Sequence, residues 1–295
     1  MSAPAPRGPA AELGRYLEIQ TLGLNLAFAV AFMLLAAHGL PSLLPVVLIV
    51  VAFIGARNAG HSFNRWADRA FDAANPRTQD RALVTGRYSS NFALAFALGN
   101  GTVLVVAAGL LNPLAFYLSF VALALIFGYS FTKRFTAWTT PFLGLVEAIT
   151  PGAVFIALRG TLPLEVLLAV GGMLLWGTAF ETIHSLGDLE SDRALGLRSL
   201  PIRIGAARSL DLIPVLHAAA LGLLAAFGAT LGLPAPYYAG LLAMAVVAAL
   251  TDLGLRRARA SPRSAFRRHF LMSSLYLAGT VAALWLPVVY FVPHI

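Results

Sequence analysis

Residues 63–78, FNRWADRAFDAANPRT, place Asn64, Asp68 and Asp72 four residues apart, shortly after the apolar run LLPVVLIVVAFIGA at residues 43–56. On an α-helix such residues lie on one face, stacked about 6 Å apart. Two carboxylates stacked in this way repel each other unless a positive group lies between or in front of them. The stretch therefore predicts a long helix that is apolar at its start and ends in a face lined with oxygen atoms.

The composition is that of a membrane protein. Hydrophobic residues make up 59% of the 295 residues, charged residues make up 12%, and the mean hydropathy is +0.78. Soluble domains are about 25% charged and roughly half apolar, so a chain this apolar predicts residence in a lipid bilayer. The sequence has no cysteine, which excludes disulfides, thiolate metal sites and cysteine nucleophiles.

Nine apolar runs approach the length of about 20 residues that crosses a bilayer. Turn signals rich in Gly, Pro and Asn separate several of them, at 38–41, 111–113, 160–163 and 232–236. The fold expected is an all-α membrane protein with nine transmembrane helices. Residues 1–15 are expected to form a disordered N-terminal lead, and residues 16–295 a single transmembrane domain. The runs are centred near Phe28, Val50, Val103, Leu123, Val146, Met173, Leu223, Ala243 and Ala282.

The basic residues predict which side of the membrane each loop occupies. Of the 21 basic residues, 20 lie before the first span or in the loops that join even-numbered spans to odd-numbered ones, and Arg159 is the exception. Cytoplasmic loops carry an excess of Lys and Arg, so the N-terminus and these loops are expected to be cytoplasmic in a multi-pass protein of the inner or plasma membrane. The net charge of +8 is then a topology signal, and nucleic acid is not an expected partner.

A second acidic stretch repeats the first. In FETIHSLGDLESDRALGLRSLPIRIG, spacings of three, four and four separate Glu181, His184, Asp188 and Asp192, so these side chains are expected to share one helix face. In both stretches a DxxxD pattern precedes an Arg-Thr or Arg-Ser pair, and the two stretches together with the nearby Asp80 hold seven of the 13 carboxylates. We expect the two stripes to face each other across a central cavity that opens to the cytoplasmic side.

Two facing oxygen stripes with basic residues nearby predict a site for a metal–diphosphate. Mg²⁺ prefers oxygen ligands and is often held by one or two carboxylates together with substrate phosphates. Arginine binds phosphate oxygens in a bidentate manner, while lysine acts as a point charge. The alternative is that each stripe only solvates a helix end and pairs with its own arginines; the repeated motif argues against it. The candidate diphosphate contacts are Arg77, Arg81, Lys133 and Arg203.

These residues resemble the motifs of the UbiA superfamily of intramembrane aromatic prenyltransferases. The first stripe matches its NxxxDxxxD motif, and Asp188 and Asp192 match its DxxxD motif. The segment YSFTKR, with Tyr129 and Lys133, resembles its YxxxK element. The loops NPRTQDRALVTGRYS and GLRSLPIRIG resemble its RTxxRxLxxGxxS and GxxSxPxRxG stretches. The resemblance covers approximately residues 15–290 and identifies the chain as a member.

The resemblance implies an activity and a cofactor. Two Mg²⁺ ions would bind a polyprenyl diphosphate, and Lys133 and Arg77 would help the metals to stabilise the departing diphosphate. The prenyl cation would attack an electron-rich aromatic ring, from which a base removes a proton. The implied catalytic residues are Asp68, Asp72, Asp188, Asp192 and Lys133. The implied metal ligands are Asn64, Asp68, Asp72, Asp188 and Asp192.

The second motif departs from the form found in many members, DxxYAxxDxxxD. Here Glu181, His184 and Ser185 replace the first Asp, the Tyr and the Ala. Glu181 keeps a carboxylate, and His184 is either an acceptor-binding group or proton relay, or a hydrogen-bonded histidine of a packed helix. Two further readings stay open: Tyr129 as an aromatic residue of the membrane interface, and Lys133 as an ordinary positive-inside residue.

The loop sequences look most like those of bacterial quinone-pathway members, which prenylate 4-hydroxybenzoate or a dihydroxynaphthoate. Both acceptors carry a carboxylate, for which an arginine of the cavity is expected. An unpaired charge within a membrane helix is costly, so Glu147 is expected to face the cavity. Members that prenylate haem or chlorophyll precursors fit these loops less well. The candidate acceptor-binding residues are Arg57, Arg65, Tyr129, Glu147, Glu181 and His184.

Two other hypotheses remain. A membrane transporter or lipid-binding protein would also have many spans, a repeat and charges at membrane depth. A transporter would carry its polar groups near the bilayer midplane, whereas here they cluster at one rim. The second hypothesis is that the chain is an inactive member of the superfamily. The intact set of five metal-ligand positions argues against this hypothesis.

Overall fold

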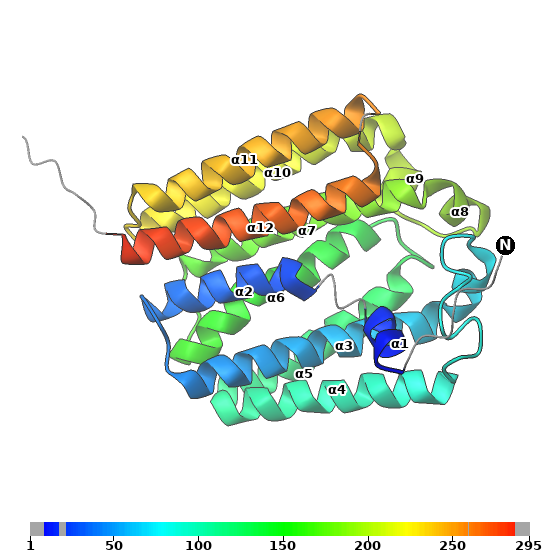
Figure 1. Ribbon diagram of the computed structural model, residues 1–295, viewed down its shortest axis with the longest axis horizontal. Helices are drawn as coiled ribbons and strands as arrows, with labels where there is room; N and C mark the ends of the chain where they lie inside the picture. Colours follow the sequence, from blue (N-terminus) through cyan, green and yellow to red (C-terminus); the bar gives the residue numbers. More distant parts are fainter. Residues whose placement is uncertain (1–8, 18–21, 259, 287–295) are drawn as a thin grey trace, which may run out of the picture.

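All regular secondary structure in the described part of the chain is helical. The structure is a computed structural model and describes residues 9–17, 22–258 and 260–286. The axes of its long helices are roughly aligned, and the short helices α8 and α9 lie at one end of them (Figure 1). The helices are α1 (Pro9–Tyr16), α2 (Leu22–Ala37), α3 (Leu43–Ala74), α4 (Ser90–Leu111), α5 (Pro113–Thr132), α6 (Thr139–Arg159), α7 (Val166–Gly187), α8 (Leu189–Ala194), α9 (Leu200–Ile204), α10 (Ala206–Thr230), α11 (Ala235–Arg256) and α12 (Pro262–Trp285).

The chain is a multi-pass membrane protein. Within the described residues, seven helices are long and apolar enough to cross a bilayer, namely α3, α4, α5, α6, α7, α10 and α11. Large apolar side chains such as Leu98, Tyr117 and Leu242 are exposed on them, as expected of surfaces that face lipid. Each of the nine expected centres falls within a helix, and α2 and α12 hold the remaining two. The count of nine spans stays a prediction.

The N-terminal segment differs in part from the expectation of disorder. Helix α1 spans Pro9–Tyr16, whereas residues 1–8 lie outside the described residues. The ring of Tyr16 is buried and makes edge contacts with the rings of Tyr88 and Phe96. Residues 9–15 are therefore helical, and α1 is held against the start of α4.

Helix ends follow the turn signals of the sequence. Asn112 separates α4 from α5, and its side chain accepts a hydrogen bond of 2.9 Å from the backbone N–H of Ala115. Pro113 follows as the first residue of α5, where its missing N–H costs nothing. Gly160 ends α6 with a φ of 70°, a left-handed conformation that glycine adopts readily.

The helices pack as two groups. One contains α3, α4 and α5, the other contains α7, α10, α11 and α12, and α6 contacts both. Helices α11 and α12 approach closely, because a Cβ atom at Gly240 would lie 2.7 Å from the Cα atom of Gly279. Small residues of this kind allow close backbone packing between membrane helices.

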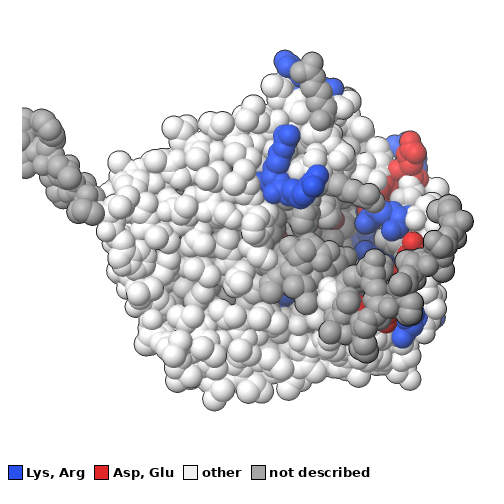
Figure 2. Space-filling model, viewed as in Figure 1, with Lys and Arg blue, Asp and Glu red and all other residues white. Residues whose placement is uncertain are grey.

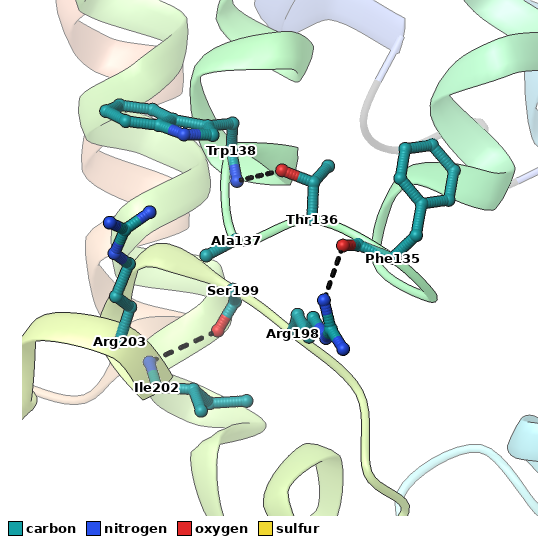
Figure 3. Close-up of a pocket in the computed structure, with 8 residues that line it drawn as sticks. All are labelled: Phe135, Thr136, Ala137, Trp138, Arg198, Ser199, Ile202 and Arg203. Atoms are coloured by element: carbon teal, nitrogen blue, oxygen red, sulfur yellow. Dashed lines mark hydrogen bonds between the residues drawn. The ribbon is translucent and has the colours of Figure 1, made fainter.

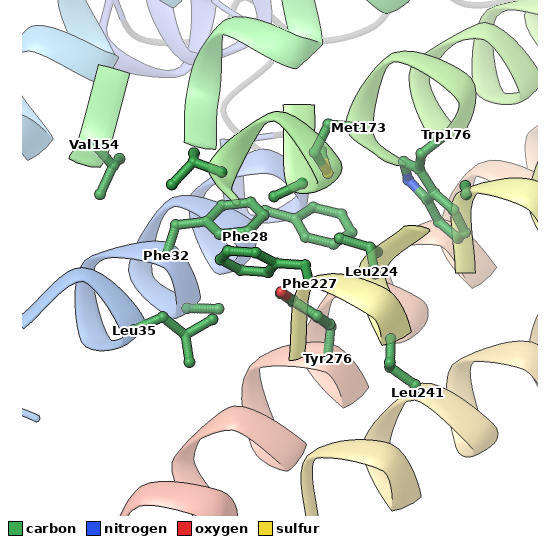
Figure 4. Packing of buried hydrophobic residues seen from close by; sticks show 14 of the residues in the cluster. Phe28, Phe32, Leu35, Val154, Met173, Trp176, Leu224, Phe227, Leu241 and Tyr276 are labelled. Carbon is green, nitrogen blue, oxygen red and sulfur yellow. The ribbon is translucent and has the colours of Figure 1, made fainter. Parts of the chain in front are cut away.

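The main hydrophobic core is rich in aromatic rings. Phe28 and Phe32 of α2 pack against Tyr276 of α12 with ring centroids 5.4 and 5.8 Å apart, and Phe32 also contacts Phe227 of α10 (Figure 4). The side chains of all four residues are no more than 1% exposed. The core fixes α2 against the second group of helices.

One polar pair lies buried between α10 and α11. His217 Nδ1 lies 2.9 and 3.1 Å from the two carboxylate oxygens of Asp252. The two side chains are 2% and 6% exposed, so neither has bulk water as a substitute partner. Sequence patterns gave no sign of this contact.

The charged side chains lie toward the end of the molecule that contains α8 and α9, with some near the middle, while the visible face at the opposite end is uncharged (Figure 2). This distribution agrees with the predicted concentration of charge in one set of loops. The assignment of this end to the cytoplasm remains a prediction.

Candidate active site

The first oxygen stripe forms as the sequence predicts. Asn64, Asp68 and Asp72 all lie on α3, in the part that carries it to the charged end of the molecule. Asp68 is 1% exposed and Asp72 is 7% exposed. The side-chain amide of Asn64 donates a hydrogen bond of 3.0 Å to Asp68 Oδ2. The amide and the nearer carboxylate are thus held together on one helix face.

The second stripe is divided between two helices. Helix α7 ends at Gly187, Asp188 has φ −110° and ψ 5°, and Asp192 lies on the short helix α8. The expectation that the second stripe occupies one face of a single helix is therefore wrong after His184. The backbone N–H of Asp192 still donates to the carbonyl of Asp188 over 2.8 Å. The two aspartates stay one turn apart beyond the end of α7.

The two stripes line one pocket, which we call the carboxylate pocket. Its volume is about 180 Å³. Side chains reach it from α3, from the end of α5, from α7 and α8, and from the loops that follow α3 and α8. The structure thus brings together most of the predicted site. The predicted residues that line this pocket are Asn64, Asp68, Asp72, Arg77, Arg81, Tyr129, Lys133, Glu181, His184, Asp188 and Asp192.

An arginine of the first motif binds an aspartate of the second. Arg77 donates hydrogen bonds from Nε and Nη2 to the two carboxylate oxygens of Asp188, each over 2.6 Å. Nearby, the side-chain amide of Asn75 donates to Ser191 Oγ over 3.2 Å. The loop after α3 is therefore joined to α8 and to Asp188, the residue that precedes it.

Basic residues also pair with both aspartates of the first stripe. Lys133 Nζ lies 2.6 Å from Asp68 Oδ2. Arg81 Nη1 donates to both carboxylate oxygens of Asp72 over 2.7 and 2.8 Å. These contacts relieve the repulsion that stacked carboxylates would otherwise suffer. Asp68, Asp72 and Asp188 thus each pair with a basic residue that lines the same pocket.

The donor set of the carboxylate pocket fits Mg²⁺. Asp68 Oδ1 is buried and accepts no hydrogen bond from any described residue, and Arg134 Nη2 lies 3.7 Å from it. Within the described residues, no three His, Asp or Glu side chains converge tightly enough to hold a metal by themselves. Mg²⁺ does not need such a cluster, because it commonly takes one or two carboxylates and completes its shell with waters and substrate phosphates.

Two further acidic groups of the pocket have distinct surroundings. Glu181 Oε1 accepts a hydrogen bond of 2.9 Å from the hydroxyl of Tyr129. Burial raises the pKa of Asp192 to about 6, and the charge of Lys133 opposes the shift. A nearby divalent cation would favour the ionised carboxylate of Asp192.

Four predicted residues lie outside the carboxylate pocket. Arg57 Nη1 donates to the carbonyl of Leu17 over 2.7 Å. The guanidinium of Arg65 lies 5.1 Å from the centre of the Tyr16 ring. Both arginines therefore contact the N-terminal segment.

The other two lie in different surroundings. Glu147 Oε1 accepts a hydrogen bond of 2.9 Å from the amide of Asn25 on α2, and Glu147 does not line the carboxylate pocket. Arg203 lies in a neighbouring pocket, with its guanidinium 5.7 Å from the centre of the Trp138 ring. Its predicted contact with the diphosphate is not supported by this position.

Several residues of the pocket were missed by the motif analysis. Thr78 Oγ1 donates to the carbonyl of Asp72 over 3.0 Å, and the backbone N–H of Arg198 donates to the carbonyl of Lys133 over 2.8 Å. Both residues belong to the Arg-Thr and Arg-Ser pairs that follow the DxxxD patterns. Those pairs were the available signal: Thr78 holds the first loop against its own stripe, whereas Arg198 joins the second loop to the residue after α5.

The chain matches known proteins over most of its length. A family described as the UbiA prenyltransferase family matches residues 25–275. The chain is 38% identical over 212 residues to 4-hydroxybenzoate octaprenyltransferase of Alcanivorax borkumensis, covering 72% of this chain and 73% of that protein. It is 34% identical over 248 residues to the enzyme of the same name from Azoarcus sp., covering 83% and 85%.

Solved structures with the same fold also match. A UbiA homologue from Aeropyrum pernix, determined in its apo form, superposes with a TM-score of 0.82 at 30% identity, covering 90% of this chain and 98% of that one. A UbiA homologue from Archaeoglobus fulgidus bound to GPP and Mg²⁺ superposes with a TM-score of 0.69 at 19% identity, covering 92% and 99%. The second likeness concerns the fold alone.

Proposed function

The chain belongs to the UbiA prenyltransferase family and is a prenyltransferase, and from this premise we propose the reaction that it catalyses. It transfers a polyprenyl group from a polyprenyl diphosphate to an aromatic acid in quinone biosynthesis, and the transfer depends on Mg²⁺. The acceptor is 4-hydroxybenzoate or a dihydroxynaphthoate. The names of the relatives favour 4-hydroxybenzoate.

One observation carries the proposal: the carboxylates of both motifs and four basic residues line a single pocket at the charged end of the membrane helices. A diphosphate needs positive charge, and a polyprenyl chain needs an apolar surface. The end of a membrane helix bundle offers both, because polar loops begin where the lipid-facing helices stop. A single substrate molecule can therefore contact both environments.

The residues proposed to hold Mg²⁺ are the oxygen donors of the two stripes: Asn64, Asp68, Asp72, Asp188 and Asp192. When bound, Mg²⁺ supplies positive charge that stabilises the diphosphate as a leaving group. A homologue of the same fold has been solved with GPP and Mg²⁺, which supports the same cofactor here.

The basic residues of the pocket have two alternative sets of partners. Arg77, Arg81 and Lys133 bind carboxylates in the structure. In the substrate complex we assign them to the phosphate oxygens, where guanidinium groups bind in a bidentate manner and the ammonium group acts as a point charge. This exchange would place positive charge on the diphosphate as the bond between carbon and oxygen breaks.

The acceptor ring then attacks the prenyl carbon and loses a proton. Water must be kept away from the cation for transfer to compete with hydrolysis. We assign Glu181 and Tyr129, which are joined by a hydrogen bond, to the acceptor side of the pocket, together with His184. We further propose that the pocket opens to the cytoplasm of a cell whose inner or plasma membrane holds the protein.

The test is a transfer assay on the full chain in nanodiscs with geranylgeranyl diphosphate, Mg²⁺ and a radiolabelled aromatic acid. We expect a prenylated product from 4-hydroxybenzoate or from a dihydroxynaphthoate, lost with EDTA and restored by Mg²⁺. Asp68→Ala should lower turnover at least about 100-fold, since replacing even a partner of a metal ligand commonly costs 10- to 100-fold. Asp80→Asn, an exposed change outside the pocket, is the control. Absence of product with every acid would refute the reaction, and full activity in EDTA would refute the metal.

A further inference from the structure

A second cavity, which we call the rim pocket, adjoins the carboxylate pocket. Its volume is about 380 Å³, within the range of small-molecule sites. It lies between the loop that joins α5 to α6 and the segment that contains α9 (Figure 3). Arg198 and Ser199 line both cavities, so they form a shared wall. The rim pocket is lined mainly by Phe135, Trp138, Arg198, Ser199, Ile202 and Arg203.

The rim pocket carries positive charge without a matching acid. Arg198 and Arg203 line it, and no acidic side chain among the described residues does. Arg198 uses one N–H to bind the carbonyl of Phe135 over 2.6 Å. The guanidinium of Arg203 binds no protein acceptor among the described residues, and its contact there is with the ring of Trp138. Most donors of the two guanidinium groups are therefore available to a bound anion.

The rim pocket also presents aromatic rings to the solvent. Phe135 is 62% exposed and Trp138 is 59% exposed. The hydroxyl of Ser199 accepts a hydrogen bond from the backbone N–H of Ile202, which leaves its own O–H as a donor. A ligand that combines an aromatic ring with an anionic group would use all of these features. A diphosphate would leave the rings unused.

The two walls of the rim pocket are held together by hydrogen bonds within the protein. Arg198 donates its backbone N–H to the carbonyl of Lys133 and its side chain to the carbonyl of Phe135. The first bond also connects the rim pocket to the residue that pairs with Asp68. A pocket fixed in this way loses less conformational entropy on binding than a mobile one.

We propose that the rim pocket is where the aromatic carboxylate acceptor first binds, with its carboxylate between Arg198 and Arg203 and its ring against Trp138. The inference rests on the proposed function, since it assumes an aromatic acid as acceptor. Such an acid is soluble in water and must approach a pocket that holds four aspartates. Two arginines at the entrance attract an anion that those aspartates repel, and the shared wall leads from one cavity to the other.

The experiment measures binding and turnover separately on the full chain in nanodiscs of neutral phospholipid. Calorimetry with 4-hydroxybenzoate, in EDTA and without prenyl diphosphate, measures binding of the acid apart from transfer, and the part of it that depends on Arg203 reports the rim pocket. We expect Arg203→Gln to weaken this binding about tenfold, as for loss of a hydrogen bond to a charged group. In the transfer assay the same variant should raise the KM for the acid and leave the KM for geranylgeranyl diphosphate unchanged. Trp138→Leu should weaken binding, whereas Trp138→Phe, which keeps a ring, should retain most of it.

Arg208→Gln is the matched control, because Arg208 is an exposed arginine of α10 that lines neither cavity. Equal binding of 4-hydroxybenzoate to Arg203→Gln and Arg208→Gln would overturn the inference. So would pyrophosphate binding that depends on Arg203 when 4-hydroxybenzoate binding does not. If the wild type binds the acid through Arg203 but transfers no prenyl group, the proposed function fails and the rim pocket stands. If transfer occurs with an unchanged KM in Arg203→Gln, the proposed function stands and the rim pocket fails.

Discussion

Arg77 and Asp188 lie 111 residues apart in the sequence and are joined by two parallel hydrogen bonds of 2.6 Å. The pair connects the loop of the first motif to the second motif, across the carboxylate pocket. A diphosphate that binds Arg77 would compete with Asp188 for the same N–H groups. Release of Asp188 would then provide a carboxylate for the metal, so substrate binding and completion of the metal site are coupled.

Arg77→Gln is expected to raise the KM for the polyprenyl diphosphate about tenfold, because glutamine cannot form a charged bidentate contact with phosphate. The KM for the aromatic acid should change little. Steady-state transfer assays with each substrate varied in turn check this. Arg87→Gln is the control, since Arg87 belongs to the same loop but contacts Thr85, Asp80 and Glu12. An unchanged KM for the diphosphate in Arg77→Gln would contradict the assignment.

Lys133 is the only lysine of the sequence, which allows a chemical test as well as a genetic one. Lys133→Gln should lower kcat on the order of 10²-fold, as for removal of one preorganised donor to a developing negative charge. An amine-reactive reagent should inactivate the wild type, and geranylgeranyl diphosphate with Mg²⁺ should slow the inactivation. Peptide mass spectrometry checks the site of labelling. Labelling of Lys133 at the same rate with and without substrate would argue against its contact with the diphosphate.

Glu147 is expected to act on the acceptor side, although it lies outside the carboxylate pocket. Glu147→Leu removes the acceptor of the hydrogen bond from Asn25 and should lower turnover about tenfold, since a partly buried amide is left without its partner. Glu147→Gln, which keeps an acceptor oxygen, should lose less. Glu165→Gln, at the opposite end of the membrane helices from the pocket, is the control. Full activity of Glu147→Leu would show that the prediction is wrong.

The buried pair of His217 and Asp252 is expected to matter for stability and not for substrate binding. Asp252→Ala leaves His217 without its partner and should cost about 2 kcal/mol of unfolding free energy. The double change His217→Phe with Asp252→Leu should cost less than the sum of the single changes, because no polar group is then left unpaired. Thermal unfolding in detergent measures both. A lower midpoint with unchanged KM values is the expected result, and additive losses would contradict the coupling.

The helical architecture was accessible from the sequence because hydropathy and turn residues act locally. Each expected span centre lies in a helix, and Asn112 and Gly160 end helices as their side chains predict. The break after α7 was missed although Gly187 marks it, since glycine after a periodic run is a stop signal for a helix. The spacing of the carboxylates suggested one face of a continuous helix, and this interpretation was preferred to a helix end at Gly187.

The contacts between distant segments were not accessible. The motifs predicted that two oxygen stripes meet, but not that Arg77 would bind the stripe of the other motif. Asn25 with Glu147 joins α2 to α6, and His217 with Asp252 joins the consecutive helices α10 and α11. Such pairs depend on how helices rotate and cross, which is set by packing and leaves no local periodicity.

The bond between Arg198 and the carbonyl of Phe135 suggests a route to new substrates. The rim pocket is built from the loop between α5 and α6 and the short segment that contains α9, which are joined by this bond and contribute little to the hydrophobic core. Exchanging both segments together, as one cassette, should therefore alter which aromatic acids are accepted while the membrane-embedded scaffold is left intact. The specificity for the acceptor could then be transferred between related enzymes by grafting these segments, or changed by selection from libraries of them.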